Sequence, residues 1–244
     1  MKRIGLYPRV HVDTNGVGVV SQAGDVALVE TVRVAGLDRA LSAALARSRK
    51  PMAIHDPAKV ISDLAIALAL GGDCLADVAL LRAEPGVFGA VASDPTASRT
   101  IDALAADPKR ALAAIDTARA AARARVWRLA GEHAPDHGID ADRPLLIDTD
   151  ATLVTAHSDK DQAAPTFKRG FGFHPLWAFD HGAEGTGEPL SCLLRKGNAG
   201  SNTALDHIAV VKAALAQLPS RRSGTRPGRK ILIRTDWRDA RTSS

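Results

Sequence analysis

The spacing of hydrophobic and polar residues changes near residue 140, from a helical period to an alternating one. Upstream of that point, apolar residues recur every three or four positions, which indicates amphipathic helices. Asp-Pro pairs mark three helix starts, because aspartate is a good N-cap and proline suits the first helical position. The predicted helices cover residues 37–46, 57–70, 95–105 and 108–133. The first part of the chain is therefore a predicted helical module.

The segment before these helices has a different pattern. Residues 9–32 alternate around two turn-like strings at residues 13–16 and 22–25. Alternation between turn signals is typical of short strands. We therefore expect one or two β-hairpins ahead of the helical module.

A polar, turn-rich string at residues 131–143 separates the helical module from the C-terminal part of the chain. We place the domain boundary there, with an N-terminal region at residues 1–135 and a second domain at residues 144–244. The second domain has three predicted strands, a helix and a fourth strand, which cover residues 145–154, 170–179, 190–194, 203–218 and 230–235. This is the element order of a ribonuclease H-like sheet, in which the first strand is central and the fourth returns parallel to it. The predicted fold class is α+β or α/β, a helical module followed by an incomplete ribonuclease H-like mixed sheet.

Carboxylates on the first and fourth of these strands are the candidate chemistry. Asp148 and Asp150 lie two residues apart on an otherwise apolar strand, so both side chains point to the same face. Asp236 directly follows the fourth strand, which the fold places beside the first. Hard oxygen ligands of this kind bind Mg²⁺, and a pair of such ions can activate an attacking oxygen and stabilise a leaving one. A surface strand end or a turn is the alternative interpretation of Asp148 and Asp150.

Composition narrows the classes of function. The 244 residues are 45% hydrophobic, enough for one large domain or two smaller ones. A net charge of +5 and a pI of about 9.5 favour a polyanionic partner. The two cysteines have neither metal nor disulfide spacing, so we expect a reducing, cytoplasmic location. No apolar run suits a membrane span, and the glycine-rich loop at residues 197–202 favours a structural turn and helix cap over a nucleotide-binding loop. We therefore expect neither membrane association nor a small-molecule cofactor.

Basic residues near the candidate carboxylates are predicted contacts for the phosphates of a polyanionic partner. Lys168, Arg169 and His174 follow the first strand, and Arg221 and Arg222 begin a basic loop before the fourth. Each could contact phosphates near the metals, or lie on a solvated surface. The basic residues of the predicted helix at 108–133 leave the same two interpretations open, a phosphate-contacting face or a solvated one.

Several motifs together resemble one known family, the DDE transposases of bacterial insertion sequences, in the group whose catalytic domain opens with an Asp-x-Asp-x-Thr strand. The likeness covers nearly the whole chain and is most specific at residues 147–160, 168–176, 194–202 and 233–236. Two upstream stretches, residues 71–77 and 93–99, also look like the helical N-terminal region of this group.

The resemblance implies roles for particular residues. Asp150 would be the first catalytic carboxylate and Asp236 the second, with Asp148 as a neighbour or alternate ligand. These carboxylates would hold two Mg²⁺ (or Mn²⁺) ions, and the partners would be the DNA of the element ends and the target DNA. The resemblance leaves the oligomeric state open, a homodimer included.

The chain departs from the family pattern after Asp236. The family's third catalytic residue is a glutamate on a later helix, whereas only Asp239 is acidic in the tail of this chain. A frameshift or internal truncation just past Asp236 would explain the departure. We therefore expect little or no transposition by this polypeptide, because phosphoryl transfer depends on positioning and charge stabilisation.

Two other classes of function remain as alternatives. The first is a non-catalytic DNA-binding fragment that modulates transposition by an intact enzyme. The second is a phosphatase with an aspartyl nucleophile, which the Asp-x-Asp-x-Thr string at residues 148–152 fits superficially. The hairpin-like strands at residues 170–194 argue against the phosphatase, because that class uses a doubly wound sheet.

Overall fold

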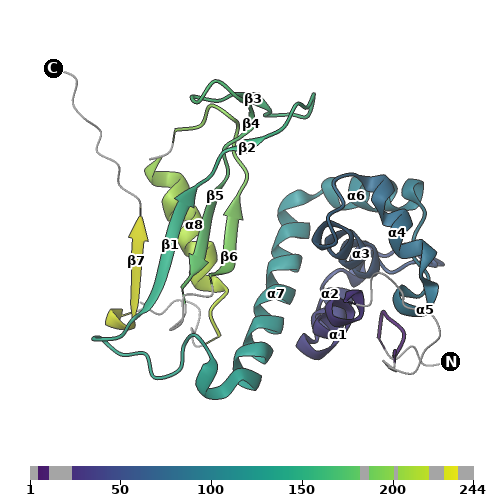
Figure 1. The fold of residues 1–244 in the computed structure, drawn as a ribbon, viewed down its shortest axis with the longest axis horizontal. Coiled ribbons are helices and arrows are strands. Elements are labelled where there is room, and N and C mark those ends of the chain that lie inside the picture. The colour runs from purple at the N-terminus through teal and green to yellow at the C-terminus, as the bar shows by residue number, and fades with distance from the viewer. Residues whose placement is uncertain (1–4, 11–23, 182–186, 201–202, 220–227, 236–244) are drawn as a thin grey trace. The chain divides into compact units, whose positions relative to one another are not determined.

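The computed structural model describes residues 5–10, 24–181, 187–200, 203–219 and 228–235. The chain divides into two compact units, Met1–Val126 and Trp127–Ser244. The first unit is helical and the second contains a mixed sheet, which confirms the predicted α+β class (Figure 1). Among the helices in the described ranges, none combines the length and the apolar character that crossing a membrane requires.

Helices make up most of the described part of the first unit. They are α1 (Asp25–Ala35), α2 (Leu37–Ala44), α3 (Pro57–Ala69), α4 (Val78–Ala83), α5 (Pro85–Phe88), α6 (Asp94–Ala105) and α7 (Pro108–Ala130), the last of which ends in the second unit. The four predicted helices are confirmed as α2, α3, α6 and α7, with ends that differ by a few residues. The Asp56 side chain caps α3 by accepting the N–H of Ala58 at 2.9 Å. At α6 the N-cap is Ser93, and Asp94 lies inside the first turn.

The hairpin predicted over residues 9–32 is wrong where the structure describes that segment. Residues 11–23 lie outside the described residues, and from Asp25 onward the chain is helical. Val29 is fully buried against Tyr7, Leu81 and Phe88. A short apolar run satisfies either period, so burial against the neighbouring helices decided for the helix.

A buried ionic cluster joins α3 to the N-terminal segment of the first unit. The Nζ of Lys59 lies 2.6 Å from Oδ2 of Asp63 one helical turn later, and the Tyr7 hydroxyl donates to Oδ1 of Asp63 at 3.0 Å. Lys59 Nζ also lies 4.4 Å from the centroid of the Tyr7 ring. All three side chains are almost inaccessible to solvent. Charges buried in this way must be paired, so the three residues form one unit of structure.

The sheet of the second unit has the predicted topology. Its strands are β1 (Leu145–Ala151), β5 (Leu176–Asp180), β6 (Glu188–Leu193) and β7 (Ile231–Thr235), in the order β6-β5-β1-β7. β5 is antiparallel to β1 and to β6, whereas β7 is parallel to β1. The predictions that the first strand is central and that the fourth runs parallel to it are confirmed. Helix α8 (Ala204–Ala216) covers one face of this sheet (Figure 1).

Two of the predicted strands are each interrupted. A separate small sheet contains β2 (Val154–Thr155), β3 (Ala164–Pro165) and β4 (Phe171–Phe173), in the order β2-β4-β3. The predicted strands 145–154 and 170–179 therefore each contribute to two sheets. Pro175 separates β4 from β5 and has no N–H to donate to a ladder, while its carbonyl accepts the N–H of Thr152 at 3.1 Å. The small sheet lies beyond the C-terminal end of β1 (Figure 1).

Candidate active site

The two faces of β1 have different environments. Leu145, Ile147 and Thr149 are buried, and the first two join the core beneath α8 with Val210 and Ala214. The intervening aspartates lie on the other face, where Asp148 is partly buried and Asp150 is exposed. Alternation along a strand produces this division, since successive side chains point to opposite sides. The face away from α8 is the one on which strand-borne carboxylates can meet ligands.

Asp148 already has cationic partners on both of its oxygens. The guanidinium of Arg234 donates from Nε to Oδ1 at 2.5 Å and from Nη2 to Oδ2 at 2.6 Å. His181 Nε2 also contacts Oδ2. The register of the parallel pair explains the first contact, because Asp148 lies opposite Arg234. The hydrogen bonds from Arg234 hold the pKa of Asp148 below its ordinary value, with a further contribution from the charge of His181.

The Asp150 carboxylate has different surroundings from that of Asp148. Its Oδ2 accepts a hydrogen bond from the Thr152 hydroxyl at 3.1 Å, and its side chain is exposed. Within the described ranges, no lysine, arginine or histidine forms an ion pair with it. Its antiparallel neighbour on β5 is Trp177, which stacks on Phe179 with centroids 5.8 Å apart. Asp150 therefore offers a carboxylate that no cation of the described residues neutralises.

Three of the predicted site residues lie outside the described residues, namely Asp236, Arg221 and Arg222. The described part of β7 ends at Thr235, whose partner on β1 is Thr149. Thr235, the last described residue of β7, therefore pairs with the β1 residue that directly precedes Asp150.

The remaining predicted DNA contacts separate into exposed and buried residues. Lys168 and Arg169 are exposed in the turn between β3 and β4, where Arg169 has a φ of 61°. His174 is 1% exposed, and its Nδ1 lies 2.7 Å from the carbonyl oxygen of Ala199, to which it donates. The prediction that His174 contacts phosphate does not fit this placement, because a buried ring cannot reach a DNA backbone. Packing of the 195–200 loop over β4 buries it.

Three residues at or near the site were missed from the sequence. Arg234 lies two residues before Asp236, as Asp148 lies before Asp150, and that parallel spacing was a usable signal for a pair. Nothing in the sequence around His181 marked it as a partner of Asp148. Arg195 is 5% exposed and donates to the carbonyls of His174 and Gly200, both at 2.9 Å. Arg195 therefore fixes the loop that leads to α8.

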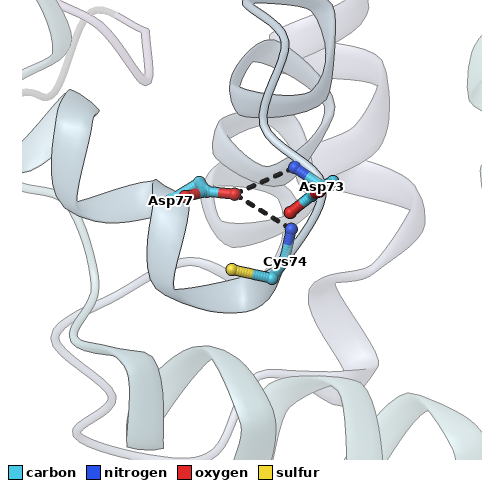
Figure 2. Close-up of side chains that lie close together, drawn as sticks. All are labelled: Asp73, Cys74 and Asp77. Atoms are coloured by element: carbon cyan, nitrogen blue, oxygen red, sulfur yellow. Dashed lines mark hydrogen bonds between the residues drawn. The ribbon is translucent and has the colours of Figure 1, made fainter.

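Another acidic group, in the first unit, has ligand-like atoms close together. Figure 2 shows Asp73, Cys74 and Asp77, whose candidate ligand atoms all lie within 4.8 Å of one another. Oδ2 of Asp77 accepts the backbone N–H of Asp73 at 2.9 Å and that of Cys74 at 3.0 Å. These hydrogen bonds lower the pKa of Asp77. The Asp77 carboxylate therefore serves as a cap for this loop, which accounts for the cluster without a metal.

Comparison with known proteins agrees with the resemblance that the motifs carry. The family model described as transposase DDE domain group 1 matches residues 2–242, nearly the whole chain. No curated protein and no solved structure matches.

Proposed function

We propose that this chain, which belongs to the transposase DDE domain group 1 family, uses Asp150 and Asp236 for divalent-metal-dependent DNA cleavage and strand transfer. The observation that carries the assignment is the contrast between two carboxylates on one face of β1. Asp148 is bound by Arg234 and His181, whereas Asp150 has only the Thr152 hydroxyl among the described residues. A cation at Asp148 would have to displace a bidentate arginine, so we assign Asp150 as the first metal ligand.

The described donor at this position fits a hard cation. Carboxylate oxygens are the ligands that Mg²⁺ and Mn²⁺ prefer, and Asp150 presents its oxygens on the solvent-accessible face of the sheet. Two such ions, as DDE transposases generally use, supply charge stabilisation for both the attacking and the leaving oxygen. Thr152 restrains the Asp150 carboxylate, and Arg234 and His181 keep Asp148 from competing for the cation.

The proposed role of Asp236 rests on chain connectivity and register. Thr235 pairs with Thr149, and Asp236 is the next residue in the chain. Consecutive Cα atoms are about 3.8 Å apart, so the residue after Thr235 begins within that distance of it. This supports Asp236 as the second carboxylate next to Asp150.

DNA is the substrate that family membership implies. The exposed turn with Lys168 and Arg169, and the basic segment with Arg221 and Arg222, are proposed phosphate contacts of the second unit. Such contacts position DNA through its backbone and do not read its sequence.

A second candidate function is DNA binding without catalysis that modulates an intact transposase. The exposed Lys168 and Arg169 would serve as phosphate contacts in that function too.

Binding of Mn²⁺, followed by electron paramagnetic resonance, tests the assignment. Asp150→Asn should weaken binding by about tenfold or more. Asp148→Asn should leave it nearly unchanged, because Asp148 is engaged by Arg234. Asp142→Asn is the matched control, since Asp142 is an exposed carboxylate ahead of the other end of β1. An Asp150→Asn protein that binds Mn²⁺ like the wild type would overturn the assignment, and an equal loss in Asp148→Asn would make Asp148 a ligand.

A further inference from the structure

The first unit has a groove that the proposed catalytic chemistry does not use. One hollow, of about 400 Å³, lies between the segment after Leu45 and helix α6, and Lys50 and Arg99 line it. A second hollow, of about 260 Å³, is lined by Arg47 and Arg110. Ser48, Ala103 and Leu104 line both hollows, so the two lie next to each other. We call the two together the basic groove and define it by its four cationic residues, Arg47, Lys50, Arg99 and Arg110.

The cations of the basic groove are largely unneutralised. Within the described ranges, the side chains of Arg47, Lys50 and Arg110 have no hydrogen bond or ion pair, and Arg99 donates only to the Thr96 hydroxyl at 3.1 Å. The one carboxylate in the lining, among the described residues, is that of Asp107, which accepts the backbone N–H of Arg110 as a helix cap.

Some arginines elsewhere in the first unit are paired, although the exposed Arg39 of α2 has no partner among the described residues. Arg33 pairs with Glu30, and Arg82 pairs with Asp94 at 2.8 Å. Unpaired positive charge collected in a depression produces a local field that attracts a polyanion.

The loop along the rim of the groove is held in shape. Arg49 donates from Nη2 to the carbonyl of Ala53 at 3.1 Å, and its Nη1 lies 3.8 Å from Oδ2 of the buried Asp56. The Ser42 hydroxyl donates to the same oxygen at 2.6 Å. Asp56 therefore anchors both the start of α3 and the loop that precedes it.

This anchored loop presents apolar side chains to solvent. Met52 is 97% exposed and has a φ of 63°, a conformation that a residue with a side chain rarely adopts. Ile54, two residues later, is 75% exposed. Because the Met52 side chain is exposed, it contributes no burial energy to the stability of the isolated protein. Strain of this kind is a common feature of ligand-binding segments.

We propose that the basic groove binds the backbone of duplex DNA, with its four cations on phosphates and Met52 against sugars and base edges in the minor groove. Apolar side chains flanked by lysine and arginine are suited to that surface, because the minor groove presents sugar and base edges between two phosphate rows. The choice of DNA as the polyanion rests on the proposed function, since a transposase acts on DNA. The proposal adds a DNA-binding surface on the first unit to the carboxylates proposed for catalysis on the second.

The salt dependence of binding gives the expected size of the effect. Each phosphate contact contributes a slope of about 0.9 to the fall of log K with log salt concentration. At about 0.15 M salt, one contact is then worth about fivefold in affinity. Lys50→Ala combined with Arg99→Ala should weaken binding by about 30-fold and reduce the slope by about 1.8.

The experiment uses the full 244-residue chain and a fluorescently labelled duplex of mixed sequence, with binding followed by anisotropy across a range of salt concentrations. The control is Arg39→Ala, which removes an exposed arginine of α2 that lines neither hollow. Met52→Ala should weaken binding without changing the salt slope, because it removes no charge. Circular dichroism establishes that each variant keeps its helical content.

The outcomes separate this proposal from the proposed function. If Lys50→Ala/Arg99→Ala binds with the affinity and slope of the wild type, or if Arg39→Ala has as large an effect per charge removed, the basic groove is not the DNA site. A wild-type chain that binds no duplex at low salt would also overturn it. None of these three results changes the assignment of Asp150 as a metal ligand, because Mn²⁺ binding is measured without DNA.

Discussion

Replacing Lys59 by methionine tests the buried ionic cluster of the first unit. The substitution keeps much of the aliphatic volume of the side chain but removes the ammonium group that lies 2.6 Å from Asp63 Oδ2. Asp63 is 1% exposed, and its remaining partner in the cluster is the Tyr7 hydroxyl. Removing one member of a buried ion pair costs about 3–5 kcal/mol, because the other charge stays buried without compensation. We expect Lys59→Met to lower the free energy of unfolding by that amount.

The loss of stability is expected to be large because both Lys59 and Asp63 are buried, where an unpaired charge is unfavourable. Burial lowers the pKa of Lys59 and is opposed by the charge of Asp63. Removing both charges should therefore recover most of the loss, because a well-packed apolar pair of similar volume is often as stable as a buried ion pair. We expect Lys59→Met/Asp63→Leu to be more stable than Lys59→Met alone.

Urea unfolding measures these free energies of unfolding. Fluorescence of the second unit provides the control in the same experiment. Circular dichroism follows the helices of the first unit. The three tryptophans, Trp127, Trp177 and Trp237, all belong to the second unit, although Trp127 lies on α7, which begins in the first. The transition seen by their fluorescence should therefore shift less than the one seen by circular dichroism. A loss below about 1 kcal/mol in Lys59→Met would refute the reasoning, because that is the value of an exposed pair. A double variant less stable than Lys59→Met would refute it as well.

Two further predictions concern the second unit. The pKa of Asp148 is lowered in the folded protein, mainly by hydrogen bonds from Arg234. Ionised Asp148 therefore contributes stability above its ordinary pKa of 3.8, and the contribution is lost as pH falls through the lowered folded value. Melting temperatures followed by tryptophan fluorescence should fall less steeply in acid for Asp148→Asn than for the wild type, and parallel profiles would contradict this. A Cβ at Gly172 would lie 2.0 Å from the carbonyl oxygen of Val154. Gly172→Ala should therefore open the small sheet, seen as faster amide hydrogen exchange in β2 and β4, and unchanged protection would show that the sheet absorbs the methyl group.

Local chemistry in the sequence determined much of this protein. The Asp-Pro pairs at Asp56 and Asp107 located helix starts, because a side-chain oxygen and a fixed φ act within one turn. Alternation along residues 145–151 placed Asp148 and Asp150 on one face, since that depends only on strand geometry. The order of strands and helix predicted the parallel return of β7, because crossover connections have one hand.

The tertiary structure decided which of these residues are available for chemistry. Arg234 lies 86 residues from Asp148 in the chain, and only the register of two parallel strands brings them together. His174 was a surface candidate in the sequence, yet packing of the 195–200 loop buries it. The period of residues 25–32 allowed a strand, but the apolar surface of neighbouring helices made it helical. Each of these outcomes depends on groups far away in sequence, whose burial and pairing energies outweigh local preferences of a few tenths of a kcal/mol.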